Sequence, residues 1–246
     1  MKNIYETILN HKSIRKYKEE DISKEDLHKL LNSVLHAPTS INGQQCSVIV
    51  IRDKNKKEQL AELTGGQEWV AKAPVFLIFV MDFARAAKAM ERQNVEIKIT
   101  ESVEATLVGA VDCGIAFGSM MNLAEAMGYG IVPIGAIRKE PEKVIEMLNL
   151  PKYVYPVVGM CVGIPDEEAE VKPRFEFDTI IHEEEYKPIS DEEIDRYDEI
   201  IKEYMTEKTN GQDTRNWTEV MNTFYSYIYF KEVKSTLEKQ GFENKK

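Results

Sequence analysis

The sequence is poor in the residues and patterns on which simple functional assignments depend. Its 246 residues include only three cysteines, Cys46, Cys113 and Cys161, which are widely spaced and form no CxxC pair. All three stand in apolar surroundings, which is typical of reduced thiols in a protein core and argues against a disulfide framework or a redox motif. The four histidines are scattered and no HExxH pattern occurs, so we predict no metal site.

Several catalytic and nucleotide-binding signatures are also missing. There is no GxSxG nucleophile elbow and no GxxxxGK[ST] phosphate loop. The one glycine-rich helix exit, Gly128-Tyr-Gly130, lacks the third glycine of a GxGxxG fingerprint and follows a helical pattern rather than a strand. No Ser/His/Asp arrangement and no pair of carboxylates suggests a catalytic side chain. The sequence therefore indicates neither a Rossmann fold nor a hydrolase.

Long hydrophobic runs are absent as well. The longest, APVFLIFVM at 73–81, is about half of a membrane span, and Glu6 and Asn10 interrupt the place where a signal peptide would be apolar. We therefore predict a cytoplasmic protein without a membrane segment. A net charge of −10 and a pI near 5.1 argue against nucleic-acid binding, but they do not exclude a small anion held by a local basic cluster.

Hydrophobic periodicity predicts a mixture of helices and short buried strands. We expect extended chain over 12–22 and turns over 37–45. The stretch 100–129 is apolar nearly all round, which predicts a central buried helix or a helix at a subunit interface. The expected helices are 2–10, 23–36, 54–63, 100–129, 142–148 and 190–207, and the expected strands are 47–53, 74–82, 155–165 and the start of 131–138.

The character of the chain changes after Pro188. Residues 190–207 are charged and amphipathic, 209–216 form a polar loop, and the stretch that follows is rich in aromatic residues. This tail lacks the apolar content of an independent domain. We therefore predict a core at 1–188 and a helical extension at 189–246, which belongs to the same domain and wraps the body or a partner subunit.

Basic side chains gather near the start of this acidic chain, in NHKSIRKY. In an extended segment alternate side chains share a face, so His11, Ser13 and Arg15 would point one way and Lys12 and Lys16 the other. An imidazole, a hydroxyl and a guanidinium suit a phosphate or another polar acceptor. Taken alone, the cluster favours a solvated helix end over an anion site.

Further donors stand in loops. Lys172-Pro173-Arg174 places two cations on a constrained turn, which is either a second half of an anion site or an ordinary surface loop. The stretches 39–44 and 65–67 offer hydroxyl and amide groups that suit a planar heterocycle. Glycine and proline at 133–138 suggest a backbone that approaches a ligand closely. Each of these stretches could also be ordinary turn chemistry.

Together and in this order, these pieces resemble the FMN-dependent nitroreductase family, in the branch of the oxygen-insensitive nitroreductases and NADPH:flavin oxidoreductases. The resemblance covers nearly the whole chain and continues through DRYDEIIKEYMTEKTNG in the tail. The matching landmarks are ETILNHKSIRKY, CSVIVIRD, LTGGQEWVAKAP, VGAVDCGIAF, LAEAMGYG, PIGAIRKEPEKV, LPKYVYPVVGMCVGIP, KPR and IHEEEYKP.

The resemblance implies an α+β fold with a mostly antiparallel central sheet flanked by helices, in an intertwined homodimer with FMN at the interface. By matching position, His11, Ser13, Lys172 and Arg174 would hold the FMN phosphate. Arg15 would reach the ribityl chain and the N1/O2 edge, and Arg138 matches a basic position of this branch. The remaining cofactor-binding positions implied are Thr39, Gln67, Ile134, Gly135 and Ala136.

The resemblance also implies the chemistry, which would occur at FMN N5 with Arg15 as electrostatic support and no catalytic side chain. NADH or NADPH would donate hydride, and small planar acceptors such as nitroaromatics, quinones or flavins would take it in a ping-pong cycle. The alternatives are a flavin reductase that supplies a partner and a non-catalytic flavin-binding or storage protein. In the loop expected to meet the nicotinamide cofactor, Arg215 is accompanied by Asp213, which would repel the 2′-phosphate of NADPH and favour NADH.

Overall fold

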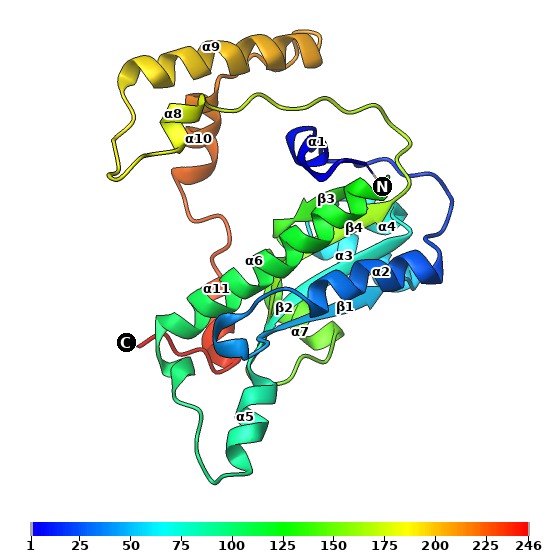
Figure 1. Cartoon of the computed structure of the whole chain (residues 1–246), viewed down its shortest axis with the longest axis vertical. Coiled ribbons are helices and arrows are strands. Elements are labelled where there is room, and N and C mark those ends of the chain that lie inside the picture. Colours follow the sequence, from blue (N-terminus) through cyan, green and yellow to red (C-terminus); the bar gives the residue numbers. More distant parts are fainter. Residues whose placement is uncertain (1, 246) are drawn as a thin grey trace. The chain divides into compact units, whose positions relative to one another are not determined.

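A computed structural model describes residues 2–245 and divides them into two compact units (Figure 1). The first comprises residues 2–169 together with 230–245, and the second comprises residues 170–229. The last stretch of the chain thus belongs to the first unit, where Leu237 and Phe242 are buried. The prediction that 189–246 wraps a partner subunit remains a prediction.

A four-stranded antiparallel sheet forms the centre of the first unit. The strands are β1 (Cys46–Ile51), β2 (Val75–Asp82), β3 (Gly130–Ile134) and β4 (Val154–Gly163), in the order β1-β2-β4-β3. Strand β2 is buried from Val75 to Met81 because strands flank it and helices cover both faces of the sheet. The expected α+β fold with a mostly antiparallel sheet is confirmed.

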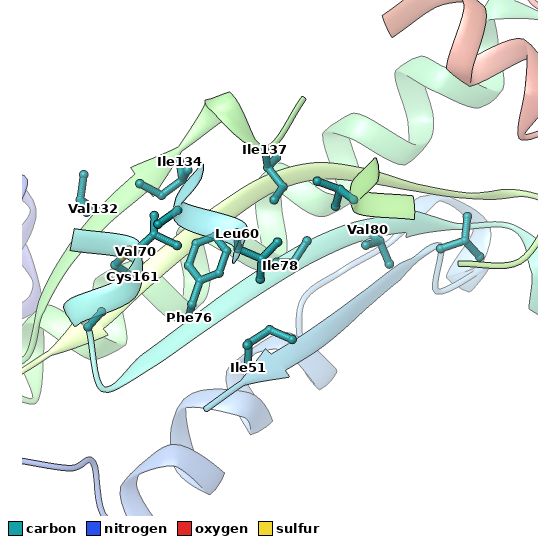
Figure 2. Close-up of a cluster of buried hydrophobic side chains, with 14 residues drawn as sticks. Ile51, Leu60, Val70, Phe76, Ile78, Val80, Val132, Ile134, Ile137 and Cys161 are labelled. Atoms are coloured by element: carbon teal, nitrogen blue, oxygen red, sulfur yellow. The ribbon is translucent and has the colours of Figure 1, made fainter. Parts of the chain in front are cut away.

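Helices pack on both faces of this sheet. Helices α2 (Lys24–Leu35) and α6 (Val103–Ala126) cover one face. The other face carries α3 (Lys54–Leu63), α4 (Glu68–Lys72) and α7 (Pro141–Met147), whose apolar side chains meet β2 and β4 around Phe76 (Figure 2). The first unit also contains α1 (Ile4–Leu9), α5 (Ala84–Glu91), α11 (Val233–Lys239) and the 3₁₀ turns η1 (Ser40–Asn42), η2 (Ile99–Glu101) and η3 (Gly135–Arg138).

Helix α6 approaches the sheet closely because small residues line its inner face. A Cβ atom on Gly109 would lie 2.8 Å from the Cβ of Met81, so no larger residue fits there without a shift. Its outer face is apolar yet exposed. By length and composition α6 could cross a membrane, but the same test is passed by core helices of soluble proteins. Here its inner face packs on the sheet, as the predicted central helix requires.

The second unit is built from α8 (Phe177–Ile180), α9 (Asp191–Lys208) and α10 (Trp217–Tyr225). Capping boxes begin α9, through Ser190 and Glu193, and α10, through Asn216 and Glu219. The ring of Phe175 stacks on Tyr197 with centroids 3.8 Å apart, and Trp217 meets Phe175 edge-on at 5.1 Å. These three rings hold the start of the unit against α9 and α10.

The predicted elements are found, with shifted ends. The expected helix 100–129 begins only at Val103, after the turn η2, and the expected helix 54–63 is confirmed residue for residue. The sequence analysis missed α4, α5, α8, α10 and α11, which are all short. The three cysteines are free thiols, and Cys113 and Cys161 are buried as expected of core residues. The thiol of Cys46 and burial raise the pKa of Cys113.

Candidate functional site

The segment that carries His11, Ser13 and Arg15 is held extended against the edge of the sheet. The backbone N–H of Ile14 donates to Ile131 O at 2.8 Å, and Ser13 forms a parallel bridge with the same residue of β3. Ile14 is buried against Gly130, where a Cβ atom would lie 2.7 Å from the Cβ of Ile14. Glycine at position 130 thus allows the segment to dock, and the predicted extended conformation is confirmed.

The imidazole of His11 pairs with a carboxylate on α6. His11 Nδ1 and Glu125 Oε1 are 2.8 Å apart, and the two side chains are 24% and 11% exposed. Because Nδ1 is engaged, Nε2 is the ring nitrogen that remains for a ligand.

The guanidinium of Arg15 lies over an aromatic ring. Its central carbon is 5.5 Å from the centroid of Trp69, within the range of a cation–π contact. NH1 donates to Ser13 O over 3.5 Å, and no carboxylate pairs with this guanidinium in residues 2–245. The backbone N–H groups of Arg15 and Lys16 both donate to Glu167 Oε1, which holds the backbone while the side chain stays exposed.

The turns at Gln67 and at Gly135 lie beside one another in the first unit. Gln67 Nε2 donates to Thr64 O at 2.8 Å, which orients the amide group and leaves Oε1 as its acceptor. A Cβ atom on Gly65, whose φ is +89°, would lie 3.0 Å from Nζ of Lys139, the residue that follows η3. Arg138, in η3 itself, donates to Val157 O.

These contacts place Ser13 and Arg15 near the start of β2, while the register sets Ile134 level with Ile78, in the middle of that strand. Arg15 contacts Trp69, two residues after Gln67, while Ser13 bridges β3 three residues before Ile134. Ile134 is buried, and Gly135 and Ala136 are half-buried, with Gly135 at the start of η3.

Thr39 lies at the opposite end of the same sheet. Its loop runs beside the end of β2, because the N–H of Asp82 donates to Gln45 O at 3.0 Å. Arg15 and Trp69 lie near the start of β2, where Tyr17 and Pro74 both lie against Gly163. Six residues of strand separate the two ends, which is about 20 Å. One chain therefore does not bring Thr39 together with Arg15.

Lys172 and Arg174 belong to the second unit. Their turn is held by Arg174 NH1, which donates to Lys172 O at 2.8 Å, and by the hydroxyl of Tyr197, which donates to Pro173 O at 3.0 Å. The ring of Phe175 anchors the turn from its C-terminal side. That they hold the FMN phosphate with His11 and Ser13 remains a prediction.

Arg215 is neutralised by its neighbour. Its Nε and NH2 donate to the two carboxylate oxygens of Asp213 at 2.9 and 2.6 Å, and its backbone N–H also donates to Asp213. These hydrogen bonds lower the pKa of Asp213 to about 2. The carboxylate that the sequence analysis expects to repel a 2′-phosphate thus occupies the guanidinium itself.

The donors of the first unit fit the FMN that the resemblance implies. His11 and Arg15 provide the polar and cationic donors that a phosphate or an electron-rich ring edge requires. In residues 2–245 no carboxylate pairs with the guanidinium of Arg15. The indole N–H of Trp69 is buried with no hydrogen-bond partner in residues 2–245. An unsatisfied hydrogen-bond donor therefore lies beside this site. No cluster of metal-ligating side chains occurs in the described part of the chain.

Three residues of this region were missed by the sequence analysis. Glu125 pairs with His11, Trp69 supports Arg15, and the buried carboxylate of Asp112 accepts from the N–H of Ser40 in the loop of Thr39. A signal for two of them was present, since Asp112 and Glu125 are carboxylates on a largely apolar helix, and such groups are buried only with a partner. No comparable signal distinguishes Trp69 from a core aromatic residue.

Comparison with protein families yields two matches along the chain. Residues 8–164 match the nitroreductase family, and residues 172–245 match the C-terminal domain of the nitroreductase family. Together they include every residue proposed above for the site.

Individual relatives agree with these matches. The FMN reductase [NAD(P)H] of Bacillus subtilis is 43% identical over 251 residues, and the alignment covers 100% of both chains. The solved structure of NfrA2 from B. megaterium superposes with a TM-score of 0.96 at 44% identity, with 98% of each chain covered. The NADPH:FMN oxidoreductase of Vibrio harveyi, solved in complex with NAD⁺, gives a TM-score of 0.89 at 31% identity, again with 98% of each chain covered. The chain thus belongs to the nitroreductase family, as the order of its sequence motifs predicts.

Proposed function

We propose that this protein is an FMN-dependent oxidoreductase that takes hydride from NADH or NADPH and reduces small planar acceptors, namely nitroaromatics, quinones or free flavins. The observation that carries the proposal is that Arg15 contacts Trp69 beside Gln67 and that the turn before Gln67 lies against Lys139 at the end of η3, in a chain of this family. Relatives named for reduction of FMN by NAD(P)H and for NADPH:FMN oxidoreduction support it.

The phosphate end of FMN would meet cationic and hydroxyl donors. His11 and Ser13 of the first unit, with Lys172 and Arg174 of the second, are the groups proposed to hold it. Hydrogen bonds from charged groups to phosphate are roughly twice as strong as neutral ones, so this end supplies much of the affinity.

The ring of FMN would be placed by Gln67 and by the backbone at Ile134, Gly135 and Ala136. When bound, FMN supplies the redox chemistry by accepting hydride from the nicotinamide and passing it to the acceptor. Arg15 would stabilise negative charge near the N1/O2 edge. At ~4 Å and an effective dielectric of 20, such an attraction is roughly 4 kcal/mol before desolvation.

We further propose that the protein acts as a homodimer whose site needs both copies. Val103, Leu107, Val111 and Ile115 form an exposed apolar stripe along α6, between 39% and 58% exposed. Thr39 and Arg15 lie at opposite ends of β2 within one chain, which are about 20 Å apart along the strand, so we infer that Thr39 serves the flavin of a second copy. A partner packed on the α6 stripe would cover the apolar surface and supply that residue.

The reductase proposal is tested by mixing the yellow, FMN-loaded protein anaerobically with NADH and, separately, with NADPH. Bleaching of the flavin absorbance by at least one nucleotide within the time of a turnover is expected, and parallel initial-rate lines with a nitroaromatic would establish the ping-pong order. If neither nucleotide reduces the bound flavin, the reductase proposal fails and a flavin-storage protein is the remaining interpretation. A much higher kcat/KM for free FMN than for nitroaromatics would favour the flavin-reductase alternative.

The dimer proposal is tested by the molar mass in solution. The native protein is expected at twice the 28.3 kDa of the chain. Val111→Glu, which places a charge in the α6 stripe, is expected to give a monomer that no longer retains FMN. The matched control is Val95→Glu, which is also an exposed apolar residue but lies off the stripe and away from the loop of Thr39. A native monomer that binds FMN would refute the shared site.

A further inference from the structure

The loop of Thr39 has an unfavourable backbone conformation. Ile41, Asn42 and Gln44 have φ angles of 49°, 55° and 54°, in the left-handed region. Residues other than glycine rarely adopt this region, and a β-branched residue such as Ile41 is a genuine outlier there. Such conformations persist where the surrounding structure enforces them, and they are frequent at ligand-binding sites. Contacts from outside the loop must therefore maintain its shape.

The first of these contacts comes from the central helix α6. Asp112 is 2% exposed, and its two carboxylate oxygens lie 3.2 and 3.3 Å from the backbone nitrogen of Ser40, whose N–H donates to them. Burial of a carboxylate is costly unless it accepts hydrogen bonds. Since Ser40 directly follows Thr39, this hydrogen bond ties the start of the loop to α6.

The second contact comes from α5 and holds the other end of the loop. Arg85 NH2 donates to the carbonyl oxygens of Gln44 and Cys46, the latter at 3.1 Å. Its NH1 donates to Asp82 Oδ2 and to Ser47 Oγ, both at 2.7 Å. One exposed side chain thus joins the end of the loop to strands β1 and β2.

The loop held in this way orients the hydroxyl of Thr39. Thr39 Oγ1 accepts from the N–H of Gln44 at 3.0 Å, which leaves the hydroxyl proton for an acceptor outside the loop. Thr39 and Gln44 also line a cavity of about 300 Å³, so this side of the loop borders open space. The carbonyl and hydroxyl oxygens of a flavin are suitable acceptors for such a proton.

We propose that Asp112 and Arg85 are positioning residues, which hold the loop of Thr39 in its left-handed conformation so that the Thr39 hydroxyl can donate to the FMN of a second copy. This inference rests on the proposed function and its shared site. Asp112 and Arg85 act through Thr39 rather than by contact with the cofactor. The loss of either contact should therefore lower FMN affinity no further than the loss of the Thr39 hydroxyl does.

The test is a double-mutant cycle on the Kd for FMN, measured by fluorescence titration of the flavin-free protein. Thr39→Val keeps the shape of the side chain and removes the hydroxyl, so it should raise Kd roughly 2- to 10-fold, as expected for one lost hydrogen bond. Arg85→Ala should raise Kd by a similar or smaller factor. The double variant should match Thr39→Val, because residues that act as one unit are not additive.

Two further comparisons support the cycle. Lys88→Ala removes another exposed cation of α5, one that pairs with Glu91, and should keep the native Kd. Asp112→Ala should repeat the effect of Arg85→Ala, while Asp112→Asn retains an oxygen acceptor for the loop and should lie between Asp112→Ala and the native protein. Because Arg85 is exposed, its variant keeps the test valid if Asp112→Ala does not fold.

The outcomes separate this inference from the proposed function. A native Kd in Thr39→Val or in Arg85→Ala would overturn the inference while FMN binding itself persists. So would a double variant whose Kd is raised by the product of the two single factors, because Arg85 would then act independently of Thr39. Failure of the native protein to bind FMN would instead refute the proposed function.

Discussion

Two arginines of this protein, Arg15 and Arg215, differ in the group that contacts the guanidinium. Arg15 lies over the ring of Trp69, and no carboxylate within residues 2–245 pairs with it. Arg215 donates two hydrogen bonds to Asp213, the residue two positions before it. An aromatic partner fixes a guanidinium but leaves its charge available, whereas a bidentate carboxylate consumes it. The comparison suggests that the first arginine is kept for an anionic or electron-rich ligand and the second is not.

The largest effect is expected from removal of the available charge. Arg15→Ala should raise the Kd for FMN roughly 10- to 100-fold, because a hydrogen bond to a charged group contributes about 1.5–3 kcal/mol. Fluorescence titration of the flavin-free protein measures it. Arg15→Lys, which keeps the charge but loses the planar fork, should be intermediate. An unchanged Kd in Arg15→Ala would remove Arg15 from the site.

A smaller effect is expected when the aromatic support of Arg15 is removed. Trp69→Leu should weaken FMN binding roughly 2- to 5-fold, since an exposed cation–π contact is worth about 0.5–1 kcal/mol. Trp69→Phe keeps a ring and should restore most of the affinity. The same titration decides it, with thermal unfolding as a check on packing. If Leu and Phe at this position bind FMN equally, the ring does not position Arg15.

Removal of the Asp213 carboxylate from Arg215 should change the preference between NADPH and NADH by a factor similar to, or smaller than, the effect of Trp69→Leu on FMN binding. Asp213→Asn should raise the ratio of kcat/KM for NADPH to that for NADH by roughly 2- to 5-fold, as expected for an exposed ion pair worth up to about 1 kcal/mol. Glu207→Gln, which removes an exposed carboxylate at the end of α9, is the matched control for net charge. Equal ratios in the two variants would show that the Asp213–Arg215 pair does not govern specificity.

The pH dependence of this pair follows from the lowered pKa of Asp213, which is about 2. A lowered pKa means that the pair is present above the ordinary range of a carboxyl and is lost as the pH falls through about 2. The contribution of Asp213 to the NADPH-to-NADH ratio should therefore not change with pH between about pH 5 and about pH 9. If the ratio changed stepwise within that range and the step disappeared in Asp213→Asn, the prediction would be contradicted.

The smallest effect is expected for the two lysines that alternate with the proposed ligands. Lys12 faces a cavity beside Glu125 and, like Lys16, is exposed. Lys12→Ala and Lys16→Ala should each change the Kd for FMN by less than about twofold, as expected for surface charges. A loss as large as that of Arg15→Ala would mean that net positive charge, rather than the orientation of His11, Ser13 and Arg15, holds the cofactor.

Much of the fold was predictable because hydrophobic patterns report burial directly. The apolar run of β2 and the long apolar helix α6 could be identified from composition, since both are covered on most sides. The short helices α4 and α8 were not, because elements of five and four residues have too few turns for a period to emerge. The extended segment at Ser13 was predictable from its lack of helical period.

The site was predictable only in its donors and not in their partners. The loops of His11, Arg15 and Gln67 are recognisable by residue type, but Glu125 and Trp69 become partners through packing that joins residues far apart in sequence. The separation of Thr39 from Arg15 also required the sheet register, which places the two loops at opposite ends of β2. Sequence order alone carries no information on that distance.

The most direct test of the account is a crystal structure of the protein with FMN bound. We expect the phosphate within hydrogen-bonding distance of His11 Nε2 and Ser13, the ring edge beside Arg15 and Gly135, and Thr39 of a second copy at the same flavin, with Arg215 still paired to Asp213. A flavin bound within one chain away from His11 and Arg15, or a phosphate held by Arg215, would contradict it.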